Sequence, residues 1–434
     1  MKRILLMALL ALPICARAQE NTFTVDADYL SRGEIRNGGL YVEEDGDALT
    51  AGFILGRTRL VADYSRSWLS ARLTAQHAGT WGSPEGSNLS MFEAWAQFQS
   101  PGGFFAKVGR QPLSYDDQRI FGSDDWSMTG ISHDGLKVGY EGGGHKVHLF
   151  GAYNQDVANI DKGGRRFSGG IQPYKSMAAA WYHFDVPKIP LGASLLFVNI
   201  GMQAPDDYAG EDADSDIQTF FQQLAGAFVS WHPERWGVEA AYYHQWGTES
   251  SGLPLNAWMA RGKATAKPFE NWSLRAGYDY LSGDESFATP GAGAIGLTRH
   301  EIVRGFSSVY GSHHKFYGAM DFFYVSTYVN GFTPGLQNLY GGITWTPGKK
   351  LSMDASYHFL STATTIEDAS KALGHEVELS ATWTIADSVS LSAGYSFMQG
   401  TETMAILKRS SNNNRLQWGW LMLQITPKFF STKW

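Results

Sequence analysis

The fold is decided by the stretch Trp272-Ser273-Leu274-Arg275-Ala276-Gly277-Tyr278-Asp279-Tyr280. Its even positions are apolar or aromatic, and its odd positions are small, polar or charged. Successive side chains of a strand point to opposite faces, so this two-residue period predicts a strand with one apolar and one polar face. The stretch 389–397 repeats the pattern, with valine, leucine, alanine, tyrosine and phenylalanine separated by serine and glycine.

About 18 such segments follow one another along the chain. The alternation is weakest in two of them, at 191–201 and 218–231, because both faces are apolar there. The segments lie at 22–33, 51–63, 67–79, 89–100, 103–112, 134–141, 145–155, 175–186, 191–201, 218–231, 236–247, 255–267, 272–283, 336–346, 351–361, 374–384, 388–399 and 415–428.

The connections between segments alternate in length. Those after even-numbered segments are short, as at 64–66 and 100–102, whereas those after odd-numbered segments are long, as at 113–133 and 284–335. Long loops on one rim and short periplasmic turns on the other are typical of outer-membrane barrels. A sheet in lipid must close to satisfy its backbone hydrogen bonds. The sequence therefore predicts an all-β protein, a transmembrane antiparallel β-barrel of about 18 strands with long extracellular loops.

A soluble all-β protein is the alternative for such alternation. The chain lacks the 40–50-residue repeat that a propeller requires. Its last residue, Trp434, is a terminal aromatic of the kind that the barrel-assembly machinery recognises, which makes that machinery a predicted partner during biogenesis.

Composition agrees with a barrel in lipid. The 434 residues are 14% aromatic and only 18% charged, below the roughly 25% of soluble domains. A mean hydropathy of −0.24, with no apolar run of about 20 residues after the N-terminus, argues against a bundle of membrane helices. Tyrosine and tryptophan suit the two interfacial girdles of a barrel.

The N-terminus has the pattern of an export signal. Lys2 and Arg3 precede an apolar run from Ile4 to Ile14, and Ala16-Arg17-Ala18 fits the cleavage rule. We therefore predict a cleaved signal peptide at 1–18, a single barrel domain at 19–434, and the outer membrane of a Gram-negative bacterium as the location. Cleavage removes the only cysteine and three cations, which changes the net charge from −7 to −10. A disulfide scaffold and a nucleic-acid binder are both excluded.

Charged residues share the polar phase of the predicted strands, which places them in the lumen because lipid disfavours them. Cations concentrate on the second to seventh segments, with a second group on the twelfth and thirteenth, and acids concentrate on the first, fifteenth and sixteenth. Two interpretations fit: an electropositive lumen that attracts anions, or charges that neutralise one another and hydrate the pore. The inward cations are Arg57, Arg59, Arg72, Lys107, Lys137, Lys146, Arg261, Lys263 and Arg275, and the acids are Asp26, Asp28, Glu93, Asp279, Asp354, Glu376 and Glu378.

The loop at 109–133 combines charged, amide and aromatic side chains, which suits a segment folded into the lumen as a constriction. Arginine offers forked donors that match a carboxylate, and aromatic rings stack on sugars. An ordinary extracellular loop is the alternative. The candidate residues are Arg110, Tyr115, Asp116, Asp117, Gln118, Arg119, Phe121 and Trp126.

Other motifs carry little chemistry. The glycine motif at 291–296 lacks the strand and helix of a dinucleotide site. Four acids of one external loop offer carboxylates to Ca²⁺, although a solvated, charged loop is the simpler explanation, and no other cofactor is predicted. No GxSxG nucleophile elbow is present, so we predict no enzyme. The four acids are Asp206, Asp207, Asp212 and Asp214.

Several motifs resemble the alginate export family of outer-membrane proteins. They are Val108-Gly109-Arg110-Gln111, Asp116-Asp117-Gln118-Arg119, Asp134-Gly135-Leu136-Lys137-Val138 and the stretch 314–323. The resemblance implies a monomeric 18-stranded barrel whose electropositive constriction passes a polyuronate, with Arg57, Arg59, Arg110 and Arg119 as pore cations. The chain departs from the family at Asp116, where glycine is more usual.

We therefore predict a monomeric channel in outer-membrane lipid that passively conducts an anionic or hydroxylated solute. An acidic oligo- or polysaccharide such as alginate is one candidate. The alternatives are a general diffusion porin without a preferred solute, and a barrel receptor or enzyme that acts through the long loop at 284–335.

Overall fold

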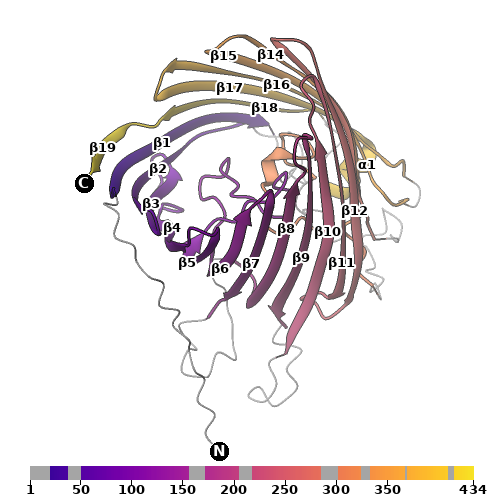
Figure 1. Ribbon diagram of the computed structural model, residues 1–434. Coiled ribbons are helices and arrows are strands. Elements are labelled where there is room, and N and C mark those ends of the chain that lie inside the picture. Colours follow the sequence, from indigo (N-terminus) through magenta and orange to yellow (C-terminus); the bar gives the residue numbers. More distant parts are fainter. Residues whose placement is uncertain are drawn as a thin grey trace, which may run out of the picture.

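The computed structural model describes residues 20–37, 50–155, 172–204, 218–284, 302–323, 333–366, 369–408 and 415–434. Within them, antiparallel strands pair in chain order and close into a barrel (Figure 1). The strands are β1 (Thr22–Asn37), β2 (Thr50–Arg66), β3 (Leu69–Thr80), β4 (Asn88–Gln99), β5 (Phe104–Gln111), β6 (His133–Gly142), β7 (His145–Tyr153), β8 (Ser176–Asp185), β9 (Leu191–Gln203), β10 (Thr219–Trp231), β11 (Trp236–Thr248), β12 (Pro254–Phe269), β13 (Trp272–Leu281), β14 (Leu336–Gly348), β15 (Leu351–Ser361), β16 (Ala372–Ala386), β17 (Val389–Gly400), β18 (Arg415–Ile425) and β19 (Lys428–Lys433).

The barrel closes where β1 pairs with β2 on one side and with both β18 and β19 on the other. The sequence predicts one last strand at 415–428, but the structure interrupts it at Pro427. Proline has no backbone N–H to donate, so the ladder is interrupted there and continues as β19 in the same register, which shifts only further on, between Val25 and Asp26. Counted as one interrupted strand, β18 and β19 make the eighteenth. The predicted fold class is confirmed.

Apolar side chains cover the outer face. Leu60, Leu73 and Leu149 are about half exposed, as expected for residues that meet lipid rather than a protein core. At the rim of short turns, Trp231 packs against Trp236 with ring centroids 4.3 Å apart, and Trp272 stacks on the opposite Trp345 at 5.5 Å. These rings form part of an interfacial girdle, and short turns place this rim on the periplasmic side.

Helix is scarce in the described part of the chain. It contains the short helix α1 (Glu402–Lys408) and the 3-10 turn η3 (His313–Lys315). No helix among the described residues is both long and apolar enough to span a membrane.

Two connections fold into the ring of strands (Figure 1). The first inner segment, residues 112–132, joins β5 to β6, and the second inner segment, residues 302–323, belongs to the connection from β13 to β14. The two segments meet inside the barrel: Tyr310 forms a β-bridge with Phe121, and the Gly122 N–H donates to the Tyr310 carbonyl at 2.9 Å. The barrel is therefore not an open tube.

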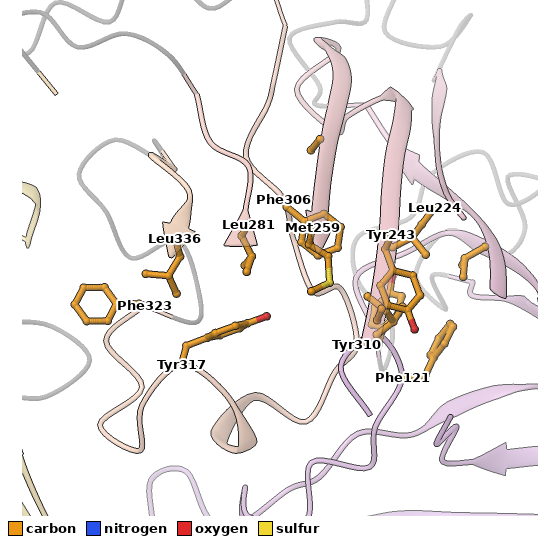
Figure 2. Packing of buried hydrophobic residues seen from close by; sticks show 14 of the residues in the cluster. Phe121, Leu224, Tyr243, Met259, Leu281, Phe306, Tyr310, Tyr317, Phe323 and Leu336 are labelled. Carbon is orange, nitrogen blue, oxygen red and sulfur yellow. The ribbon is translucent and has the colours of Figure 1, made fainter. Parts of the chain in front are cut away.

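The inner segments carry an apolar core into one side of the lumen. Phe121, Tyr310 and Tyr317 of these segments belong to one buried cluster with Leu224 of β10 and Met259 of β12, and Figure 2 shows Phe121 and Tyr310 on the side of Leu224. Leucine, valine and isoleucine on the inner face of β9 are also fully buried. Strands β9 and β10 are thus apolar on both faces, one toward lipid and one toward this core. That explains why the two-residue alternation is weak in their sequences.

Three sequence predictions fall outside the described residues. They are the signal peptide at 1–18, the acidic loop with Asp206, Asp207, Asp212 and Asp214, and the glycine motif at 291–296.

Candidate functional site

Arginines of β2 fasten the first inner segment to the barrel wall. Arg57 donates from Nη1 to the Asp125 carbonyl at 2.9 Å, and Arg59 donates from Nη1 to the Asp125 carboxylate at 2.6 Å. Arg57 also forms an ion pair with Asp28 of β1 at 2.9 Å, and only 1% of its surface is exposed. Both arginines thus lie on the lumen face, as the alternation of β2 predicts. Their guanidinium groups, however, bind acceptors of the protein rather than facing a free pore.

Trp126 of the first inner segment joins the second inner segment to the closure strand β1. Its ring stacks on His314 with centroids 4.1 Å apart, and the guanidinium of Arg32 lies 3.9 Å from its centroid. Arg32 also donates to the Trp126 carbonyl at 3.0 Å. The indole is therefore held between two protein groups.

A buried ionic cluster joins the first inner segment to β12 and β13. Asp117 accepts from Arg119 of its own segment and pairs with Arg261 of β12, each at 3.2 Å. Arg119 pairs with Asp279 of β13 at 3.2 Å and donates to the Tyr317 hydroxyl at 2.6 Å. Each buried charge of the cluster has an opposite partner, as burial requires.

The cluster fixes the ionisation of its loop members. Burial raises the pKa of Asp117, but Arg119 and Arg261 outweigh it and hold that pKa below its usual range. Burial lowers the pKa of Arg119, but Asp279, Tyr317 and Asp117 outweigh it and keep that pKa well above the usual value. Both groups are charged at neutral pH.

Asp116 adopts a left-handed backbone conformation with φ of 52°. This is the position at which the family that the motifs resemble more usually has glycine. Glycine enters this region without strain, whereas other residues do so at a cost of about 1–2 kcal/mol. The Asp116 carboxylate accepts from Trp181 Nε1 at 3.2 Å and from the Tyr243 hydroxyl at 3.5 Å. These bonds to β8 and β11 offset the strain. Burial raises the pKa of Asp116.

Two of the aromatic candidates are buried in protein. Tyr115 stacks on Trp181 with centroids 4.7 Å apart, and Phe121 stacks on Tyr310 at 5.8 Å. Neither ring presents a free face to a solute. The predicted sugar-stacking surface is thus part of the packing that holds the segment.

Glu376 and Glu378 of β16 hold the second inner segment. The Met320 N–H donates to Glu376 Oε1 at 2.8 Å, and the Ala319 N–H donates to Glu378 Oε1 at 2.6 Å. The sequence placed both acids inside the barrel but gave no sign of this role. Gln118 of the first segment accepts from the Lys315 ammonium of the second at 3.1 Å.

The remaining predicted pore cations differ in their partners. Arg72 pairs with Asp63 at 2.7 Å, Arg110 pairs with Asp134 at 2.7 Å, and Arg275 pairs with Asp354. Among the described residues, no carboxylate lies within 4 Å of the ammonium groups of Lys107 and Lys137. Lys107 instead lies 3.6 Å above the ring of Trp95, and Lys137 lies 6.0 Å from the centre of the Phe105 ring.

A cavity of about 380 Å³ separates the inner segments from the wall of β11 to β16. Such a volume suits a small molecule, since small-molecule sites enclose about 300–1,000 Å³. Cations and acids both face it, together with tyrosine, asparagine, serine and histidine. The charged lining residues are Arg119, Arg261, Lys263, Arg275, Lys315, Asp117, Glu239, Asp279 and Glu378.

Comparison with known proteins agrees with this arrangement. The sequence profile described as Alginate export matches residues 68–416. The chain belongs to the alginate export family. The motifs of the resemblance at 116–119 and 314–323 of this chain occupy the two inner segments, where Gln118 and Lys315 meet. A search of curated proteins gave no match.

Solved outer-membrane porins share the fold of this alginate export family member. A BenF-like porin from Pseudomonas fluorescens Pf-5 matches with a TM-score of 0.61 and 12% identity, over 94% of this chain and 99% of that one. Pseudomonas aeruginosa OccK2 (OpdF), in a complex with glucuronate, matches with a TM-score of 0.60 and 11% identity, over 94% and 98%. Pseudomonas aeruginosa OccK5 (OpdH) matches with a TM-score of 0.58 and 10% identity, over 94% and 99%.

Proposed function

We propose that this protein is an outer-membrane channel that passively conducts small anionic, hydroxylated solutes of the sugar-acid class. The observation that carries the proposal is the cavity of about 380 Å³ at the constriction, whose lining has five cations on four elements against four acids. Its lysines and arginines match a carboxylate, and its serine, asparagine and tyrosine match hydroxyl groups. The glucuronate in the complex of OccK2 is a solute of this kind.

A small solute fits this lumen better than a polysaccharide chain does. The two inner segments share hydrogen bonds and an apolar core, so a thick chain would have to displace them. Alginate itself, which the family name suggests, is therefore a candidate to be tested as a short oligomer as well as a polymer. The channel needs no catalytic group, because the electrostatic field of the lumen, the pore diameter and the hydrogen-bonding groups of the wall select a solute as it diffuses through.

The test is the ion selectivity of the full-length protein in planar lipid bilayers, measured as a reversal potential in a KCl gradient. Liposome swelling with glucuronate and with glucose, a neutral sugar of similar size, complements it. We expect anion selectivity and faster entry of glucuronate than of glucose. Cation selectivity, or faster entry of glucose, would refute the proposal.

A general diffusion porin is the second candidate, and one observation favours it. All seven arginines predicted to line the pore have a carboxylate within 3.2 Å, so their charges are largely neutralised in place. Equal entry of glucuronate and glucose with no ion selectivity would support this candidate. A complete lack of conductance would favour a receptor or enzyme.

A further inference from the structure

Lys107 and Lys137 form a pair of like charges on the lumen wall. They are direct neighbours across β5 and β6, where opposite residues have Cβ atoms about 5 Å apart. Both are half-buried, and both lie on the inner face, because Val108 and Leu136 beside them are exposed on the lipid side. Lys107 comes four residues before Gln111, where β5 ends and the first inner segment begins, so the pair lies on the periplasmic side of the constriction.

Aromatic rings hold these ammonium groups without neutralising them. The Lys107 Nζ lies 3.6 Å from the ring centre of Trp95, and the Trp95 indole is itself fixed by donating to Glu93 Oε1 at 3.1 Å. Lys137 lies near Phe105. A cation–π contact attracts an ammonium group but leaves its full positive charge. Two such charges side by side repel each other, and an anion bound between them would compensate that repulsion.

The nearby acids are already engaged. Glu93 accepts from Thr74 Oγ1 at 3.0 Å and lies 3.6 Å from Arg72, and Glu141 is hydrogen-bonded to His148 Nε2 at 2.9 Å. Lys146, another lysine of the same wall, has the carboxylate of Asp185 at 3.3 Å. In the described part of the barrel, the pair therefore differs from its charged neighbours in having no carboxylate within ion-pair distance of either ammonium group.

We propose that Lys107 and Lys137 form a carboxylate-binding subsite on the periplasmic half of the lumen wall, separate from the cavity at the constriction. Its ligand is the carboxylate of a sugar acid, which lies between the two ammonium groups and supplies the missing counter-charge. The subsite rests on the proposed function, because a solute reaches it only through the lumen. An anion on the periplasmic side of the constriction thus has a second binding site.

The experiment measures block of the single-channel KCl current by glucuronate in planar bilayers, with glucose as the neutral probe. The variants are Lys107→Gln, Lys137→Gln and the double variant, and Lys146→Gln is the matched control. Each single substitution should raise the half-blocking glucuronate concentration about tenfold, since it removes one charge-assisted hydrogen bond. The control should stay within about twofold, because its pair is solvent-exposed. Lys107→Arg, which keeps the positive charge, should be blocked by glucuronate at about the same concentration as the wild type.

Folding of each variant is checked by its heat-modifiable gel mobility and its unitary KCl conductance. Glucuronate block of the double variant equal to that of the wild type would overturn the subsite, and so would absence of block in an anion-selective wild type. In both cases the proposed function would stand on its selectivity. A wild type that is not anion-selective would instead overturn the proposed function.

Discussion

Replacement of Arg119 by methionine tests whether the buried ionic cluster holds the first inner segment in the lumen. Arg119 is almost fully buried, and it pairs with Asp117 and Asp279 and donates to Tyr317. Methionine keeps much of the side-chain volume, so the change removes the charge rather than opening a large cavity.

The expected cost follows from what each partner retains. Asp117 keeps its ion pair with Arg261, and Asp279 keeps the hydrogen bond from Asn338 Nδ2 at 3.0 Å but has no other cation within 4 Å among the described residues. One buried carboxylate thus loses its cation, and breaking a buried ion pair from one side costs about 3–5 kcal/mol. We expect a loss of about 3 kcal/mol in the free energy of unfolding, at the lower end because of that remaining hydrogen bond.

The assay is urea-induced unfolding in lipid vesicles, followed by tryptophan fluorescence. Arg110→Met is the matched control, because its pair with Asp134 is partly exposed, and we expect at most about 1 kcal/mol there. Adding Asp279→Asn to Arg119→Met should recover part of the loss, since it removes the stranded charge. A loss below about 1 kcal/mol for Arg119→Met, or no recovery in the double variant, would show that the cluster does not hold the segment.

Three further predictions concern the first inner segment. Asp125→Ala removes the acid shared by Arg57 and Arg59, so the anion-to-cation permeability ratio from reversal potentials should rise. Asp116→Gly relieves the left-handed backbone but leaves the donors of Trp181 and Tyr243 without their acceptor, and urea unfolding should show a net loss of about 1 kcal/mol. Burial and nearby Asp321 raise the pKa of Asp124 to about 6. Its protonated form is therefore favoured by folding, so its contribution to stability falls as pH rises from about 4 to about 6, and Asp124→Asn should abolish that part of the pH dependence of the urea midpoint.

The strands were predictable because their pattern is local. Alternation over a dozen residues fixes both the strand and the face of each side chain, so the inward phase of Arg57 and Arg261 follows from sequence. Their partners do not follow, because Asp125 and Asp117 reach them from a folded-in connection. The arrangement of charges within the lumen is set by tertiary contacts that the alternation does not encode.

That the second inner segment lies inside the barrel was not predicted from the sequence, although the composition of this segment contains a signal for it. Residues 302–323 contain Phe306, Tyr310, Tyr317, Phe322 and Phe323, which are all buried. So many large apolar residues are unusual in an exposed loop, because exposed apolar patches are disfavoured unless they bind something. This composition, together with the loss of alternation in β9 and β10, is the signal that would have placed the segment against their inner faces.

The ion pairs change how selectivity in this barrel is to be explained. An arginine that anchors an inner segment through a carboxylate adds little net field to the lumen, because the two charges cancel at a distance. Lys107, Lys137 and Lys315, whose observed partners in the described chain are rings or an amide, have no carboxylate in contact to cancel their charge. Anion preference should therefore depend on these lysines more than on the seven arginines, although sequence motifs single out the arginines. Comparison of reversal potentials between Lys315→Gln and Arg72→Gln separates the two explanations, since a larger shift for Arg72→Gln would return the role to the arginines.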